Sequence, residues 1–264
     1  MPFPEVKRVI YRKNPLDQVI CQLRFPPILK IDADIPAEFQ DRVRKDFPNF
    51  SETSEWKMPL SPRIKEQISP EVLTQILQSS SGKNYEFSSE DGQWKINLTR
   101  TFIALTANKY ERWEIFKEKL AIPVNALVEI YSPAYFSRIG LRYEDVIRRS
   151  VLNLDGVSWS ELLQPYILGV LGLPEIGNSV RNFESRYEIG LSDGASVVRM
   201  ITRFVEAVDN GEICYMIDSD FSNTNKTRID NTMNKLDYFN VRASRLIQWC
   251  ITDRLHQSME PQTL

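Results

Sequence analysis

Residues 136–147 read Phe136-Ser-Arg-Ile-Gly-Leu-Arg-Tyr-Glu-Asp-Val-Ile147, and this stretch decides the fold class. Apolar side chains occupy every second position from Ile139 to Tyr143, and Arg138 and Arg142 stand out of phase with them. Successive side chains of a strand point to opposite faces. The pattern therefore predicts a β-strand with one buried and one charged face, which is typical of an antiparallel sheet packed on one side only.

Three further strands are predicted after this one, at residues 182–191, 196–205 and 212–221. The first two are separated by Ser192-Asp-Gly-Ala195 and the last two by Asp209-Asn-Gly211, and both segments are typical of tight turns. Strands joined by short turns pair antiparallel. The second half of the chain is therefore expected to form an antiparallel sheet.

The first half of the chain has a similar pattern of strands. A strand is predicted at 18–25, where apolar and polar residues alternate before two prolines. Segments 85–89 and 93–99 flank Asp91-Gly92 and predict a hairpin, and the strand pattern continues through 102–106.

Helices are expected around these strands. Two long amphipathic helices are predicted at 109–131, where Pro123 should introduce a kink, and at 228–256. Shorter helices are predicted at 36–47 and from Ser158 to about 168.

The order of elements is the same in both halves. We therefore predict an α+β fold of two similar strand–helix–antiparallel sheet–helix units, at 1–133 and 134–264, with a variable insertion near 49–82. TATA-binding-protein-like and helix-grip folds have this kind of order. The expectation is an analogy of fold, from which function does not follow.

Composition narrows the classes of function. The 264 residues carry a net charge of −2, and the pI is about 5.7, which disfavours a general nucleic-acid binder, since such domains are usually strongly basic. No apolar run approaches the roughly 18 residues of a membrane helix. The three cysteines, Cys21, Cys214 and Cys250, are widely spaced and predict buried, reduced thiols. We expect a cytoplasmic protein without a membrane segment.

The sequence carries no familiar catalytic motif. The sequence has no phosphate-binding loop, dinucleotide-binding glycine motif, nucleophile elbow or metalloprotease helix, and we expect no cofactor. Its one histidine, His256, is expected near a helix C-terminus. Asp218 and Asp220 share one face of a predicted strand and could hold Mg²⁺, with Glu144 and Asp145 as nearby acids. The alternative interpretation is that Asp218 and Asp220 are ordinary polar residues on the solvent-exposed face of an antiparallel sheet.

Arginines recur on the predicted outward faces of several strands. Two interpretations stay open: a cradle for an anionic partner, or a solvated face whose arginines are balanced by Glu144, Glu188, Asp218 and Asp220. The candidate binding residues are Arg24, Arg138, Arg142, Arg186, Arg199 and Arg203.

Three segments carry a family resemblance. They are Asn14-Pro-Leu-Asp-Gln-Val-Ile-Cys-Gln-Leu-Arg-Phe-Pro-Pro-Ile28, Tyr110-Glu-Arg-Trp-Glu-Ile-Phe116 and Arg138-Ile-Gly-Leu-Arg-Tyr143. Together they resemble a sporadically distributed bacterial family of uncharacterised proteins, over most of the chain. The resemblance implies accessory or mobile genes, such as those of phage defence, and brings no catalytic residues.

The expected function is a non-enzymatic binding or interaction module, as a subunit of a bacterial defence or toxin–antitoxin assembly. Its partner is expected to be another protein rather than nucleic acid, and self-association stays open. The alternative is a metal-dependent enzyme that acts on a phosphorylated or nucleotide substrate through Asp218 and Asp220.

Overall fold

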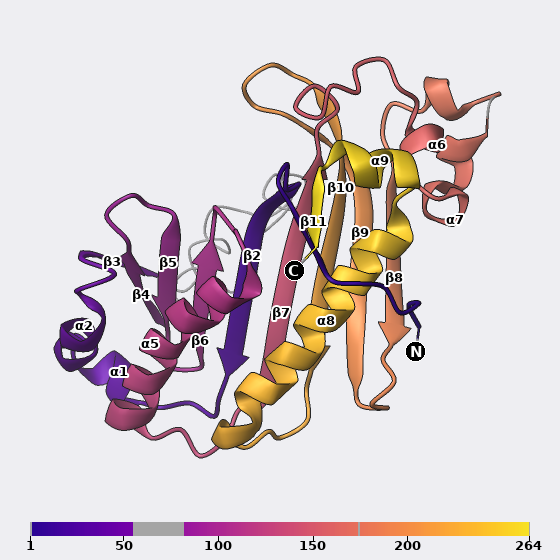
Figure 1. Ribbon diagram of the computed structural model, residues 1–264. Helices are drawn as coiled ribbons and strands as arrows, with labels where there is room; N and C mark the ends of the chain where they lie inside the picture. The colour runs from indigo at the N-terminus through magenta and orange to yellow at the C-terminus, as the bar shows by residue number, and fades with distance from the viewer. Residues whose placement is uncertain (1, 55–81, 174, 264) are drawn as a thin grey trace, which may run out of the picture.

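The computed structural model describes residues 2–54, 82–173 and 175–263. They form one large antiparallel sheet with helices on one face, together with a small two-stranded sheet (Figure 1). The predicted α+β class is confirmed. Within these ranges, no helix has both the length and the apolar character needed to cross a membrane.

The large sheet has nine strands in the order β3-β4-β5-β6-β2-β7-β10-β9-β8. In chain order they are β2 (Leu16–Arg24), β3 (Asn49–Ser54), β4 (Lys83–Ser88), β5 (Trp94–Leu98), β6 (Phe102–Ala107), β7 (Arg138–Ile147), β8 (Glu184–Gly190), β9 (Ser196–Glu206) and β10 (Ile213–Asn223). The sequence did not predict the second sheet, in which β1 (Val9–Tyr11) pairs with β11 (Pro261–Thr263) and ties together the two ends of the chain.

Strands β2 and β7 meet at the centre of the sheet, where Cys21 pairs with Leu141. Outward from this junction, the first half of the chain gives β2, β6, β5, β4 and β3, and the second gives β7, β10, β9 and β8. In each half the first strand is central and the last strand before the long helix lies beside it. Superposition of the two halves as similar units stays a prediction.

The two long helices lie on the same face of this sheet (Figure 1). Each covers its own half of the sheet. The helices are α1 (Lys30–Ala33), α2 (Ala37–Val43), α5 (Trp113–Tyr131), α6 (Trp159–Leu162), α7 (Pro165–Leu168), α8 (Thr232–Cys250) and α9 (Asp253–Ser258), with 3-10 turns at Gly169–Gly172, Gly177–Ser179 and Ile229–Asn231.

Two helices that were predicted to be continuous are each divided into two shorter helices. The helix expected at 228–256 begins at Thr232 and is interrupted at Ile251, whose backbone pairs with Leu163. Thr252 then caps α9 by accepting a hydrogen bond from the backbone of Leu255. The helix expected from Ser158 is also interrupted, because Leu163 is extended and a new helix starts at Pro165.

The other helix boundaries also differ. Helix α5 begins at Trp113, four residues later than predicted, and contains Pro123. The helix expected at 36–47 ends at Val43. Of the insertion predicted at 49–82, the first residues form β3, which pairs with β4. Residues 55–81 of this insertion lie outside the described residues.

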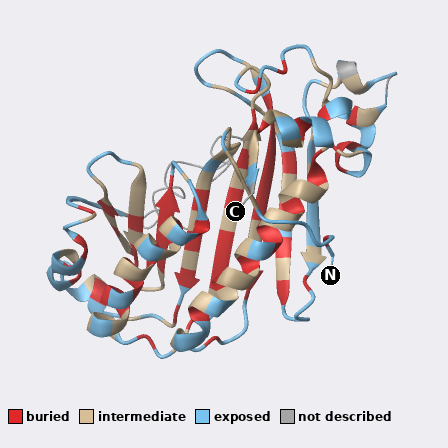
Figure 2. Ribbon diagram, viewed as in Figure 1, coloured by how far each residue is buried: buried red, intermediate tan, exposed pale blue. Residues whose placement is uncertain are grey.

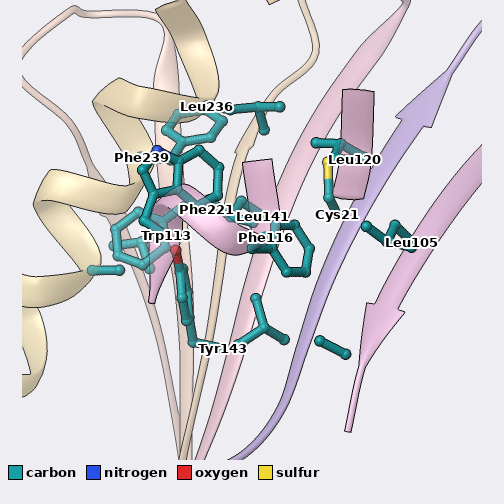
Figure 3. Packing of buried hydrophobic residues seen from close by; sticks show 14 of the residues in the cluster. Cys21, Leu105, Trp113, Phe116, Leu120, Leu141, Tyr143, Phe221, Leu236 and Phe239 are labelled. Carbon is teal, nitrogen blue, oxygen red and sulfur yellow. The ribbon is translucent and has the colours of Figure 1, made fainter. Parts of the chain in front are cut away.

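The core lies between the sheet and the two long helices. Figure 2 shows buried residues along the central strands and on the sheet-facing sides of the helices. Phe116 of α5 packs on Trp94 of the hairpin, with ring centroids 5.8 Å apart. Phe239 of α8 packs on Phe221 of β10 at 6.3 Å (Figure 3). All three cysteines are buried and free, as predicted.

Candidate functional site

The six candidate arginines lie on the face of the sheet opposite the long helices. Strand alternation places Arg138 and Arg142 away from Leu141, which is fully buried in the core. Cross-strand register then aligns Arg142, Asp220, Arg199 and Glu188 in one row across β7, β10, β9 and β8. The arginine-bearing face is defined here by Arg24, Arg138, Arg142, Arg186, Arg199 and Arg203 with the carboxylates Glu144, Glu184, Glu188, Asp218 and Asp220.

The inner part of this face consists of half-buried ion pairs. Arg142 donates to both carboxylate oxygens of Asp218 at 2.7 Å and pairs with Glu144 at 2.8 Å. Arg138 donates to both oxygens of Asp220, at 3.0 and 2.7 Å. The hydrogen bonds to Asp218 raise the pKa of Arg142, and burial raises the pKa of Glu144. These pairs hold the central strands together.

The same hydrogen bonds count against the alternative that Asp218 and Asp220 bind a metal ion. All four oxygens of Asp218 and Asp220 accept hydrogen bonds from guanidinium groups. A cation would have to displace both arginines to reach these oxygens. In the part of the chain that the structure describes, no group of three or more acidic, histidine or cysteine side chains is placed to hold a metal ion.

The outer part of the face, on β8 and β9, is open to solvent. Arg199 pairs with Glu188 at 2.7 Å. Glu184 accepts from Arg186 at 2.6 Å and lies 3.9 Å from Arg203. Exposed pairs of this kind contribute only about 0–1 kcal/mol each. A partner can therefore replace them at little cost.

Arg24 lies at the other end of the face. It stands directly opposite Arg138 on the neighbouring strand, and both donate to the side-chain oxygen of Gln22, at 3.0 and 3.3 Å. The structure thus brings all six arginines to one face, but in three different settings: inner pairs, outer pairs, and Arg24 with an amide partner.

A second site was missed by the sequence prediction. Asp145 follows Ile139, Leu141 and Tyr143 in the same strand phase, so its side chain points to the helix-covered side of β7. The residue is only 6% exposed. An acid in an apolar phase was the signal in the sequence that could have found this site.

Asp145 lines a cavity of about 90 Å³ between the centre of the sheet, α8, β1 and the segment before α5. Burial, and to a lesser extent the charge on Asp218, raise the pKa of Asp145 to about 7. Across the cavity, Tyr143 donates a hydrogen bond to Asn240 Oδ1 at 3.0 Å. Tyr110 lies edge-on to Tyr143, with ring centroids 6.1 Å apart.

His256 has a structural setting near this cavity. It lies in the last turn of α9, and its Nδ1 is hydrogen-bonded to the hydroxyl of Tyr11 at 2.7 Å. Helix α9 is thereby tied to β1, one wall of the cavity.

No protein-family model matches the sequence, and no curated protein matches it either.

Proposed function

We propose that this chain is a non-enzymatic interaction module that binds another protein through the outer part of the arginine-bearing face. The observation that supports the proposal most is the set of three exposed guanidinium groups of Arg186, Arg199 and Arg203 on one face of β8 and β9. Arg186 of β8 stands opposite Ile201, which lies between the two arginines of β9. Guanidinium groups form paired hydrogen bonds with carboxylates. Carboxylates of a partner can therefore exchange with Glu184 and Glu188.

The balance of charge favours a protein over nucleic acid. Six arginines share the face with five carboxylates, so the face has almost no net charge. A phosphate backbone is drawn to surfaces with a large excess of basic groups, and its affinity comes from that excess. A protein surface that offers both acidic and basic side chains complements a face of mixed charge.

Exposed apolar residues elsewhere support the same class of partner. The segment after α6 exposes four large apolar side chains, and nucleic-acid interfaces are more polar than this. They are Tyr166, Val170, Leu173 and Ile176.

The inner pairs support a structural role for Asp218 and Asp220, so we do not propose the metal-dependent enzyme. Membership of a bacterial defence or toxin–antitoxin assembly is proposed on the family resemblance alone. Identification of the partner protein tests the proposed membership of such an assembly separately.

A photo-crosslinking experiment tests the proposed surface. A benzophenone amino acid replaces Ile201, which lies between Arg199 and Arg203 on the same face of β9. In a matched control it replaces Val241, which is exposed on α8 at the opposite face of the sheet. We expect the Ile201 probe, in cells of the organism that encodes the chain, to give one major adduct with a protein, absent from the control. Adducts with nucleic acid, no adduct, or equal adducts from both positions would contradict the proposal.

A further inference from the structure

Asp145 lies in a confined space and has no hydrogen-bond donor or cationic partner among the described residues. Its side chain lines the cavity, and the residue is 94% buried, being 6% exposed. Within residues 2–54, 82–173 and 175–263, no side chain or backbone group donates a hydrogen bond to its carboxylate. A buried charge is costly unless it is paired. The position therefore suggests a carboxylate kept available for a ligand.

Aromatic rings form much of the wall around this carboxylate. The rings that line the cavity are those of Tyr11, Tyr110, Trp113 and Tyr143. The negative faces of such rings attract cations, and the attraction is stronger when the cation is removed from water. Rings together with one carboxylate form a pocket selective for a positively charged group.

Two hydroxyl groups of the wall can accept hydrogen bonds from a ligand. The hydroxyl of Tyr143 donates its proton to Asn240 and is also hydrogen-bonded to Tyr110, which leaves one lone pair of its oxygen to accept a hydrogen bond from a ligand. The hydroxyl of Ser219, from β10, also lines the cavity. A ligand with several N–H donors can satisfy these oxygens and the carboxylate at the same time, whereas a quaternary ammonium has no such donors.

The charged groups around the cavity leave Asp145 uncompensated. Arg8 lines it from the N-terminal side, but both of its terminal nitrogens donate to the carboxylate of Glu114, at 2.6 and 3.0 Å. Glu111 and Arg112 are exposed and of opposite charge. From the sheet, Asp218 adds negative potential, and α8 contributes only neutral side chains to the lining.

We propose that this cavity binds a small ligand that carries a protonated primary amine, with Asp145 as its counter-ion. The ammonium group donates hydrogen bonds to the Asp145 carboxylate and to the Tyr143 hydroxyl, while the aromatic rings surround its carbon atoms. The site lies on the helix-covered side of the sheet, opposite the arginine-bearing face. It is therefore independent of the proposed protein interaction.

The affinity should depend on pH in a defined direction. The ligand needs the ionised form of Asp145, whose pKa of about 7 leaves it mostly protonated at pH 6. Arg8, whose pKa is raised by Glu114, and Glu114, whose pKa is lowered to about 2 by Arg8, keep their charges between pH 6 and pH 8, and a primary alkylammonium does too. Binding should therefore strengthen as pH rises from 6 to 8.

Ligand-observed NMR titration of the full chain with propylammonium tests the proposal. Propanol serves as the neutral analogue and tetramethylammonium as the cation without N–H donors. For a ligand of four heavy atoms we expect saturable binding of propylammonium with a Kd of about 0.1–10 mM. Binding of the two analogues should be at least about tenfold weaker, which is about 1.4 kcal/mol.

Three variants locate the site. Asp145→Asn should weaken propylammonium binding at least about tenfold, and Ser244→Phe should block the cavity without changing its charge. Asp230→Asn, in an exposed ion pair with Arg228, is the matched control and should bind as the wild type does. Since the two cavity variants alter it in different ways, failure of one to fold leaves the other as the test. Absence of saturable binding to the wild type, equal binding of propanol or tetramethylammonium, or unchanged binding by a folded cavity variant would each overturn the proposal.

Discussion

Replacement of Asp145 by Asn should stabilise the protein, and the gain should grow with pH. The pKa of this carboxyl rises from 3.8 to about 7 on folding, chiefly because it is buried. Between these two values the folded state binds more protons than the unfolded state. The wild type therefore loses stability as pH rises through this window, and above about pH 7 the loss is complete.

The size of the effect follows from the displacement of the pKa. One pKa unit corresponds to about 1.4 kcal/mol, so ionised Asp145 costs the folded state about 4 kcal/mol at pH 8. At pH 5 the cost is about 2 kcal/mol, because the unfolded carboxyl is already ionised. Asparagine has nearly the same shape and no charge. Its advantage should therefore grow by about 2–3 kcal/mol from pH 5 to pH 8.

Urea unfolding followed by circular dichroism at pH 5, 6, 7 and 8 measures this gain directly. The control is Asp230→Asn. The hydrogen bond from Arg228 lowers the pKa of Asp230, so this carboxylate stays ionised between pH 5 and pH 8. A constant difference between Asp145→Asn and wild type across the four pH values would refute the reasoning. It would show that folding does not raise the pKa of Asp145, so that its charge would not destabilise the folded state.

Other features of the fold give shorter predictions. Trp113→Ala, which removes a buried ring stacked on Phe116, should lower the free energy of unfolding by about 3–5 kcal/mol, and a melting curve like that of wild type would contradict the assigned core. Arg142→Ala leaves the buried Asp218 without its partner and should cost about 3 kcal/mol, whereas Arg199→Ala should cost less than about 1 kcal/mol; equal costs in urea titrations would refute the division into inner and outer pairs. The three cysteines should react with a maleimide only after unfolding, because burial raises their thiol pKa values. Rapid labelling of the native protein would argue against this packing.

Strand periodicity predicted much of the sheet because its signals are local. Alternation in 136–147 was enough to place Arg138 and Arg142 on the face away from the core. The turn at Asp91-Gly92 predicted the hairpin, and Gly92 does adopt a positive φ of 68°. The nine-stranded order could not be predicted in this way, because the pairing of β2 with β7 joins segments more than one hundred residues apart.

The failures have physical causes as well. Apolar periodicity continues through Ile251, so the sequence predicted one long helix where a backbone bridge to Leu163 interrupts it. Local sequence patterns also do not predict which charged residues of different strands form ion pairs. Asp218 and Asp220 have the spacing of metal ligands, but cross-strand register places arginines against both. Asp145 was visible in the sequence as an acid in an apolar phase, yet only the fold shows the cavity beside it.

The proposed protein interaction is tested most directly by the affinity of the crosslinked partner for charge-reversed variants. Calorimetric titration would compare wild type, the double variant Arg199→Glu with Arg203→Glu, and the control Arg228→Glu, whose arginine is exposed in a loop away from this face. The double variant should fold normally, because its ion pairs are exposed. We predict that it binds the partner at least about tenfold more weakly than wild type does, which is about 1.4 kcal/mol, while Arg228→Glu binds equally well. Wild-type affinity in the folded double variant would contradict the assignment of the arginine-bearing face as the binding surface.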